Sequence, residues 1–260
     1  MLALTATTGL ALWGLDATAS PAEAEKVEGR GTPARTAPPE VLAPEIALPL
    51  PPEPGPEATP PGSRAAGRVL EVLGRIRGRL RRTRYQHPTV VRERQGLYAW
   101  DCSGMAAWIL RRSAPGALGA IHRERPVARD FHRIISRSPT DRARRSWRRL
   151  AHIEEARPGD VFAWLRPPDW PRRNTGHVGF VVEAPRRVPR IADAYTVRIA
   201  DATSVPHQHD TRSWPGDGGF GTGTILFMTD GRGQATAYGW YGSESRGVVP
   251  TTIVFGRVTR

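Results

Sequence analysis

Residues 98-YAWDCSGMAAWIL-110 contain Cys102, the only cysteine in a chain of 260 residues. Asp101 precedes the thiol and is a residue type that caps helices by accepting hydrogen bonds from backbone N–H groups. From Met105 onward, apolar residues recur at the spacing of one helical face. We therefore expect a helix with Cys102 in its first turn, where the positive end of the helix dipole favours a thiolate over a thiol.

The two residues after the thiol, Ser103 and Gly104, are small and leave room for a substrate to approach. A single cysteine excludes an internal disulfide and a zinc cluster built from cysteines. In an exported protein, a lone thiol is either reactive or buried and inert. The acidic cap, the helical position and the small neighbours favour a nucleophile, whose partners must be sought elsewhere in the chain.

The net charge of +13 comes almost entirely from arginine, because Lys26 is the only lysine. Such a chain suits an anionic partner, for example a cell envelope or a nucleic acid, and composition does not choose between them. A length of 260 residues is enough for one sizeable core with additional tails.

The sequence of the first 62 residues predicts two such tails. Residues 1–22 contain an apolar stretch followed by small residues, a pattern that is typical of a signal peptide or an anchor. Residues 23–62 are rich in proline and cannot bury a core, so we expect a disordered linker before a domain at 63–260. We expect an exported protein of the periplasm or cell envelope, with an uncleaved anchor or a cytoplasmic protein as alternatives.

Helices are expected in the first part of the domain. Residues 64–84 carry an apolar stripe at helical spacing with arginines on the other faces. Such a helix either packs its stripe on the domain, which we favour, or lies on an anionic membrane. Two further helices are predicted, at 127–136 and at about 141–155. Residues 85–98 form an irregular segment or a short strand.

Strands are expected in the second part of the domain. The glycine-rich residues 217–224 lack the lysine and the helix of a phosphate-binding loop and are interpreted as turns. Helices followed by successive strands with short connections indicate an α+β domain with an antiparallel sheet. The predicted strands are 161–165, 175–183, 195–203, 223–230, 234–242 and 251–258.

A nucleophilic cysteine needs a base within hydrogen-bonding reach, and the base needs a third group to orient it. His177 is the best candidate, because it begins an apolar strand and has small neighbours. A structural, hydrogen-bonding histidine is the alternative interpretation. The histidines among arginines on the helical segments are expected to be solvated at the surface: His122, His132 and His152.

Three motifs occur in order: DCSG at 101–104, PGD at 158–160 before a strand, and GHVG at 176–179 within a strand. In this order they resemble the NlpC-type family of papain-like cell-wall cysteine peptidases. The resemblance covers residues 85–203. It implies a papain-like fold, in which N-terminal helices, including the cysteine helix, pack on the antiparallel sheet.

The resemblance also implies roles for individual residues. Cys102 corresponds to the nucleophile and His177 to the general base. The family completes the set with a polar residue on the next strand, and Asp201 fits because it shares strand parity with the apolar residues before it. An aspartate that caps a turn is the alternative for Asp201, and His207 is the alternative orienting residue.

The family often has a tyrosine near the substrate carbonyl, and we assign this position to Tyr85. Tyr98 is so close to the thiol in sequence that it is expected to pack beneath the helix. The residues expected to contact substrate are Tyr85, Asp101, Ser103 and Gly104.

The expected activity is hydrolysis of an amide bond by a Cys-His-Asp mechanism, without a metal or organic cofactor. The cluster 207-HQHD-210 lacks the spacing of a metallo-hydrolase, and we expect a loop with solvated histidines. By resemblance, the substrate is the peptide stem of peptidoglycan. Neither nucleic acid nor an obligate oligomer is expected, although an anionic envelope surface fits the charge.

Two other functions stay open. An NlpC-like amidase or acyltransferase would use the same residues on a different substrate. A non-catalytic basic protein would instead use the arginines to bind an envelope or a nucleic acid, and its binding would depend strongly on salt.

Overall fold

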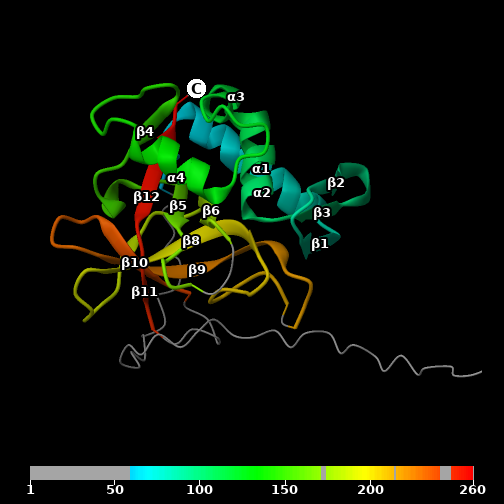
Figure 1. Ribbon diagram of the computed structural model, residues 1–260. Coiled ribbons are helices and arrows are strands. Elements are labelled where there is room, and N and C mark those ends of the chain that lie inside the picture. The colour runs from blue at the N-terminus through cyan, green and yellow to red at the C-terminus, as the bar shows by residue number, and fades with distance from the viewer. Residues whose placement is uncertain (1–58, 171–173, 214, 241–246, 260) are drawn as a thin grey trace, which may run out of the picture. The chain divides into compact units, whose positions relative to one another are not determined.

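The computed structural model describes residues 59–170, 174–213, 215–240 and 247–259 (Figure 1). The predictions of a signal peptide or anchor at 1–22 and of a linker over most of 23–62 lie outside the described residues. The described residues belong to one compact unit with a mixed α+β architecture.

A large antiparallel sheet dominates the second part of the chain. Its strand order within the described residues is β11-β10-β9-β8-β6-β5-β12-β4, and β7 pairs with β8. The strands are β4 (Trp147–Arg149), β5 (Val161–Leu165), β6 (Gly176–Val181), β7 (Arg186–Arg187), β8 (Ala194–Thr203), β9 (Gly219–Thr229), β10 (Ala235–Gly239), β11 (Val249–Pro250) and β12 (Ile253–Val258).

The helices and a small sheet come before it. The helices are α1 (Arg64–Arg79), α2 (Cys102–Ser113), α3 (Pro115–Gly119) and α4 (Ala128–Ser136), with 3-10 turns η1 (Glu93–Gln95) and η2 (Ile153–Glu155). The small sheet joins β1 (Arg82–Tyr85), β2 (Val90–Arg92) and β3 (Leu97–Trp100), and β1 runs parallel to β3. Figure 1 shows α1 to α4 gathered on one side of the large sheet.

The large sheet separates two apolar cores. On its helical side, Val178 and Phe180 of β6 pack with residues of α1, α2 and α4. On the other side, alternation places Val197 and Ile199 of β8 in a second core rich in aromatic rings. Because side chains alternate along a strand, Asp201 extends the second set, as the sequence predicted.

Helix α1 packs its apolar stripe on the domain, as favoured from the sequence. Val69, Val72, Leu73 and Ile76 are buried, and the helix lies against α2 and β12. Burying each such side chain stabilises the fold by about 1.5–3 kcal/mol. Among the described residues, no helix combines the length and the apolar character needed to cross a membrane.

Most of the predicted elements are confirmed, with ends that shift by a few residues. The helix at 127–136 corresponds to α4, and the six predicted strands correspond to β5, β6, β8, β9, β10 and β12. The segment 85–98 contains the short strand β2.

The helix predicted at about 141–155 is wrong. This segment contains β4, whose Trp147 pairs with Val258 on β12, and then the 3-10 turn η2. The Trp147 ring is fully buried, and its Nε1 donates a hydrogen bond to the Ala117 carbonyl at 2.8 Å. Pairing with a distant strand and burial of the indole therefore outweigh the helical spacing of the apolar residues.

The prediction of turns over 217–224 is also wrong for most of that segment. Gly218 and Gly219 have positive φ, which suits a turn, but β9 already begins at Gly219. Gly221 and Gly223 pair in register with Asp201 and Ile199 of β8. A strand that alternates glycine with other residues has one face without side chains, which leaves room for another segment.

The 157-RPGD-160 turn is tied to the last strand by a buried ion pair. Arg257 of β12 donates to both Asp160 carboxylate oxygens, at 3.0 and 2.8 Å. The backbone N–H of Arg157 also donates to this carboxylate at 2.8 Å. Burial raises the pKa of the Asp160 carboxyl, and Arg257 partly offsets the cost of its charge.

We expect Arg257→Leu to lower the free energy of unfolding by about 3–5 kcal/mol, because it leaves the buried Asp160 without its counter-charge. Urea unfolding followed by tryptophan fluorescence measures the difference. Arg232→Leu, at an exposed position, is the control and should change the value by less than about 0.5 kcal/mol. Equal losses in both variants would contradict a structural role for the pair.

Candidate active site

Cys102 is the first residue of α2, and Asp101 caps the helix as the sequence predicted. The Asp101 Oδ1 atom accepts hydrogen bonds from the Gly104 N–H at 2.7 Å and from the Ser103 hydroxyl at 3.0 Å. Only 6% of the Cys102 surface is exposed. The cap therefore fixes the first turn of α2 and holds the thiol at the positive end of the helix dipole.

The small residues after the thiol have structural contacts of their own. A side chain at Gly104 would collide with the Thr89 Oγ1 atom, so the space beside this glycine is taken by Thr89. The Ser103 hydroxyl is used in the helix cap. Contact of Asp101, Ser103 and Gly104 with a substrate stays a prediction.

His177 lies near the start of β6, directly opposite Trp164 of β5. The two rings stack at a tilt, with centroids 4.8 Å apart, and only 8% of His177 is exposed. Its Nε2 atom lies 2.7 Å from the Asp201 Oδ2 atom. This hydrogen bond engages Nε2 and leaves Nδ1 as the nitrogen that can exchange a proton with Cys102.

Burial alone would lower the pKa of the His177 ring. The charge of Cys102, hydrogen bonds to Asp201 and Cys102, and the charge of Asp201 reverse this effect and raise the pKa to about 9. At neutral pH the ring is therefore an imidazolium.

Asp201 is fully buried on β8 and receives three hydrogen bonds from side chains. The Nε2 atoms of His177 and His207 both lie 2.7 Å from Oδ2, and the Nη2 atom of Arg212 donates to Oδ1 at 2.8 Å. Burial would raise the pKa of the Asp201 carboxyl, but its interactions with His207, Arg212 and His177 hold it well below the usual range. The structure thus brings both candidates for the third residue together, with Asp201 in direct contact with the His177 ring.

The prediction of solvated histidines in the loop at 207-HQHD-210 is wrong for His207 and confirmed for His209. The His207 side chain is fully buried, and the Asp210 side chain is 3% exposed, whereas His209 is exposed. Among the described residues, no group of three or more His, Cys, Asp or Glu side chains could hold a metal ion.

Sequence reasoning missed Arg212 and Asp210. Arg212 donates to both Asp201 and Asp210 from the loop between β8 and β9. Arg212 belongs to none of the quoted motifs, and Asp210 was quoted only as part of the 207-HQHD-210 cluster. The one available signal in the sequence is the alternation of glycines in β9, because this loop packs over them. A side chain at Gly221 would meet the Arg212 Nε atom at 2.5 Å, and a side chain at Gly223 would meet the His207 Cβ atom at 2.7 Å.

The two candidate tyrosines lie on neighbouring strands of the small sheet. Tyr85 ends β1 and pairs with Trp100, two residues before Cys102 in the chain. Tyr98 is buried, with its ring edge against Trp108 of α2 at a centroid distance of 6.1 Å, and so packs beneath the helix as expected. Tyr85 thus lies beside the strand that leads into Cys102, and its contact with a substrate stays a prediction.

The surface positions predicted for His122 and His152 are confirmed. The one predicted for His132 is wrong, because this residue lies on the inner face of α4 and only 7% of it is exposed. Its Nδ1 atom lies 3.3 Å from the Ser136 hydroxyl, and burial lowers the pKa of the ring.

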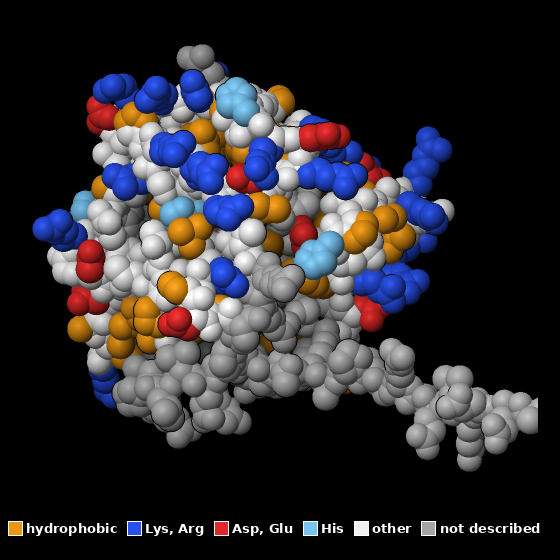
Figure 2. Space-filling model, in the orientation of Figure 1, with side chains coloured by type: hydrophobic (Ala, Val, Ile, Leu, Met, Phe, Trp, Pro, Cys, Tyr) orange, Lys and Arg blue, Asp and Glu red, His pale blue; other side chains and the backbone are white. Residues whose placement is uncertain are grey.

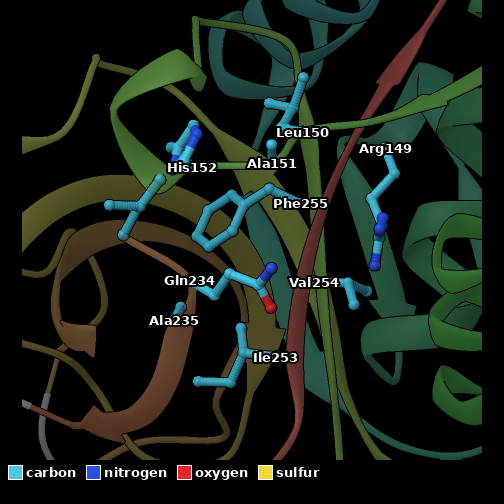
Figure 3. A pocket seen from close by; sticks show the side chains of 10 residues that line it. Arg149, Leu150, Ala151, His152, Gln234, Ala235, Ile253, Val254 and Phe255 are labelled. Carbon is cyan, nitrogen blue, oxygen red and sulfur yellow. The ribbon is translucent and has the colours of Figure 1, made fainter. Parts of the chain in front are cut away.

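A hollow also lies beside the 3-10 turn η2 (Figure 3). None of its lining residues belongs to the Cys102, His177 and Asp201 group. It is lined by Arg149, Leu150, Ala151, His152, Ile153, Gln234, Ala235, Ile253, Val254 and Phe255.

No protein-family model matches the chain, and neither the curated proteins nor the solved structures contain a match.

We expect iodoacetamide to alkylate Cys102 rapidly near neutral pH, because the thiolate is the reactive form. His177→Ala should slow the reaction by about tenfold or more near pH 6, because in this variant the thiolate loses its imidazolium partner. Mass spectrometry of the labelled protein gives the rates. His209→Ala removes an exposed histidine and is the matched control, which should react like the wild type. Equal rates in all three proteins would show that His177 does not activate the thiol.

Proposed function

We propose that this protein is a thiol-dependent hydrolase of amide bonds, with Cys102 as nucleophile, His177 as base and acid, and Asp201 as the orienting carboxylate. One observation carries the proposal: a capped helix N-terminus presents the thiol to an imidazole whose other nitrogen is bonded to a buried carboxylate. A nucleophile, a base and an orienting group in this sequence of contacts are what acyl transfer requires.

The mechanism follows from these contacts. The Cys102 thiolate attacks the amide carbonyl, and the oxyanion is stabilised by the backbone N–H of Cys102 in the first turn of α2. His177 donates the Nδ1 proton to the leaving amine, which departs and leaves a thioester. Water then attacks the thioester while His177 accepts a proton from it, the carboxylic acid is released, and the thiolate–imidazolium pair of Cys102 and His177 is restored. No metal or organic cofactor is needed in these steps.

The proposed substrate is the peptide stem of peptidoglycan, acted on outside the cytoplasm. The support is the order of the DCSG, PGD and GHVG motifs, which resemble those of NlpC-type peptidases. We further propose that the helices, α2 among them, and the antiparallel sheet form a papain-like arrangement. An NlpC-like amidase or acyltransferase with another substrate would use the same three residues.

The arginines fit an anionic envelope. Figure 2 shows Lys and Arg side chains crowded over the part of the surface where Figure 1 places the helices. On α4, Arg129 and Arg133, with Arg137 directly after the helix, are exposed and four residues apart, so they share one face. None of the three has a carboxylate partner within the described residues. We propose that this face meets an anionic polymer of the envelope.

We expect the wild-type chain, and not Cys102→Ala, to release new fragments from purified peptidoglycan, because the thiolate forms the covalent intermediate. Mass spectrometry of the muropeptides identifies the bond. Activity should fall as the pH rises through about 9, where His177 loses the proton that the leaving amine needs.

His209→Ala serves as the matched control for this digestion and should release the same fragments as the wild type. Identical product patterns from the wild type and Cys102→Ala would refute the proposed activity. Cleavage of simple peptide amides without any action on peptidoglycan would favour the alternative substrate.

We expect the Cys102→Ala protein to sediment with intact peptidoglycan sacculi at about 0.05 M salt and much less at about 0.5 M, because salt screens exposed charges. Replacing Arg129, Arg133 and Arg137 by Gln should reduce the bound fraction several-fold. Arg190→Gln with Arg232→Gln removes exposed charges outside the helices and is the control. An equal loss in both sets would contradict a role for the α4 face.

A further inference from the structure

A buried cluster of charges lies directly behind the His177 ring. Arg212 donates to Asp201 through Nη2 at 2.8 Å and to the Asp210 carboxylate through Nε and Nη2 at 2.8 and 2.7 Å. Its Nη1 atom donates to the Gly219 carbonyl at 2.9 Å. Every guanidinium nitrogen therefore has a partner, and only 3% of the side chain is exposed. A guanidinium held in this way has one fixed position.

The cluster carries an unbalanced charge. Asp201 and Asp210 supply two negative charges, whereas Arg212 supplies one positive charge, and all three side chains are buried. An uncompensated charge in the interior is costly. A protonated His177, bonded to Asp201, supplies the missing positive charge. The cluster thus favours the imidazolium form of His177.

His207 adds a hydrogen bond without adding a charge. Its Nε2 atom shares the Asp201 Oδ2 atom with His177, while its buried Nδ1 atom has no hydrogen-bond partner among the residues that the structure describes. A doubly protonated ring would bury an unpaired N–H donor, so the network assigns the neutral tautomer with hydrogen on Nε2. Trp240 stacks on the ring with centroids 4.1 Å apart and holds it in place.

The β9 strand is shaped to admit this cluster. Gly221 lies opposite Asp201 in the β8–β9 pair, and Gly223 lies two residues further along. A side chain at Gly221 would meet the Arg212 Nε atom at 2.5 Å, and one at Gly223 would meet the Asp210 Oδ2 atom at 2.8 Å. Two positions of this central strand thus lack side chains, and the space that they leave allows Arg212 and His207 to reach Asp201.

We propose that Arg212 and His207 are positioning residues that act through Asp201: Arg212 fixes one carboxylate oxygen and His207 the other, so that Asp201 stays ionised and oriented towards His177. This assignment rests on the proposed function and extends it from three residues to five.

The test measures alkylation of Cys102 by iodoacetamide between about pH 4 and pH 10, which needs no substrate, together with peptidoglycan cleavage. In Arg212→Gln, Asp201 takes up a proton at higher pH, so the acidic limb of both profiles should move up by about one pH unit, and at a given pH on that limb the rates should fall about tenfold. Arg212→Lys keeps the charge but loses the forked contacts. Its acidic limb should stay in place while cleavage slows several-fold.

The His207 pair of variants separates the hydrogen bond from simple packing. His207→Gln keeps a donor near Asp201 and should retain alkylation within about threefold of the wild type, whereas His207→Leu should lose about tenfold. His209→Leu and Arg232→Gln, at exposed positions, are the matched controls and should behave as the wild type.

Thermal unfolding of each variant separates folding from positioning. If the folded His207→Leu and Arg212→Gln proteins keep the wild-type pH profile and lose only stability, the positioning role is overturned. Should Arg212→Gln not fold, the pH profiles of the two His207 variants and of Arg212→Lys test the positioning role in the same way. A wild type that is alkylated rapidly but leaves peptidoglycan intact refutes the proposed substrate alone, because the alkylation profiles still test the positioning residues.

Discussion

The buried Asp201 carboxylate is the constraint around which this fold is arranged. A charge with no exposed surface needs several donors, and it has three: His177 on β6, and His207 and Arg212 in the loop after β8. Burial of Arg212 requires a second carboxylate, Asp210, and strand positions without side chains beneath it, at Gly221 and Gly223. The glycines of β9 and the burial of Asp210 and Arg212 thus follow from one buried charge.

The thiol and the imidazole come from different layers of the molecule. Cys102 begins α2, whose apolar face packs on the helical side of the sheet, whereas His177 shares a sheet face with Asp201. Their proximity therefore depends on the packing of helices on sheet rather than on either element alone. The Asp160–Arg257 ion pair and the N-cap at Asp101 keep the neighbouring turns in place.

Several features were predictable because local rules decide them. An aspartate before a small and apolar run specifies a helix N-terminus, and alternation in 195–203 sets the face of Asp201. By contrast, the segment 141–155 has helical spacing but forms β4 and a 3-10 turn, because Trp147 is buried against α3 and pairs with the last strand. Local periodicity carries no information about so distant a partner.

The sequence by itself determined the capped cysteine helix, the strand that carries His177 and the parity of Asp201, since each depends on residues a few positions apart. Only the tertiary structure decided that His207 and Asp210 are buried, that Arg212 joins them and that His132 is enclosed. Burial of a polar side chain depends on whether distant elements supply its partners. That balance of desolvation and hydrogen bonding exists only once the chain has folded.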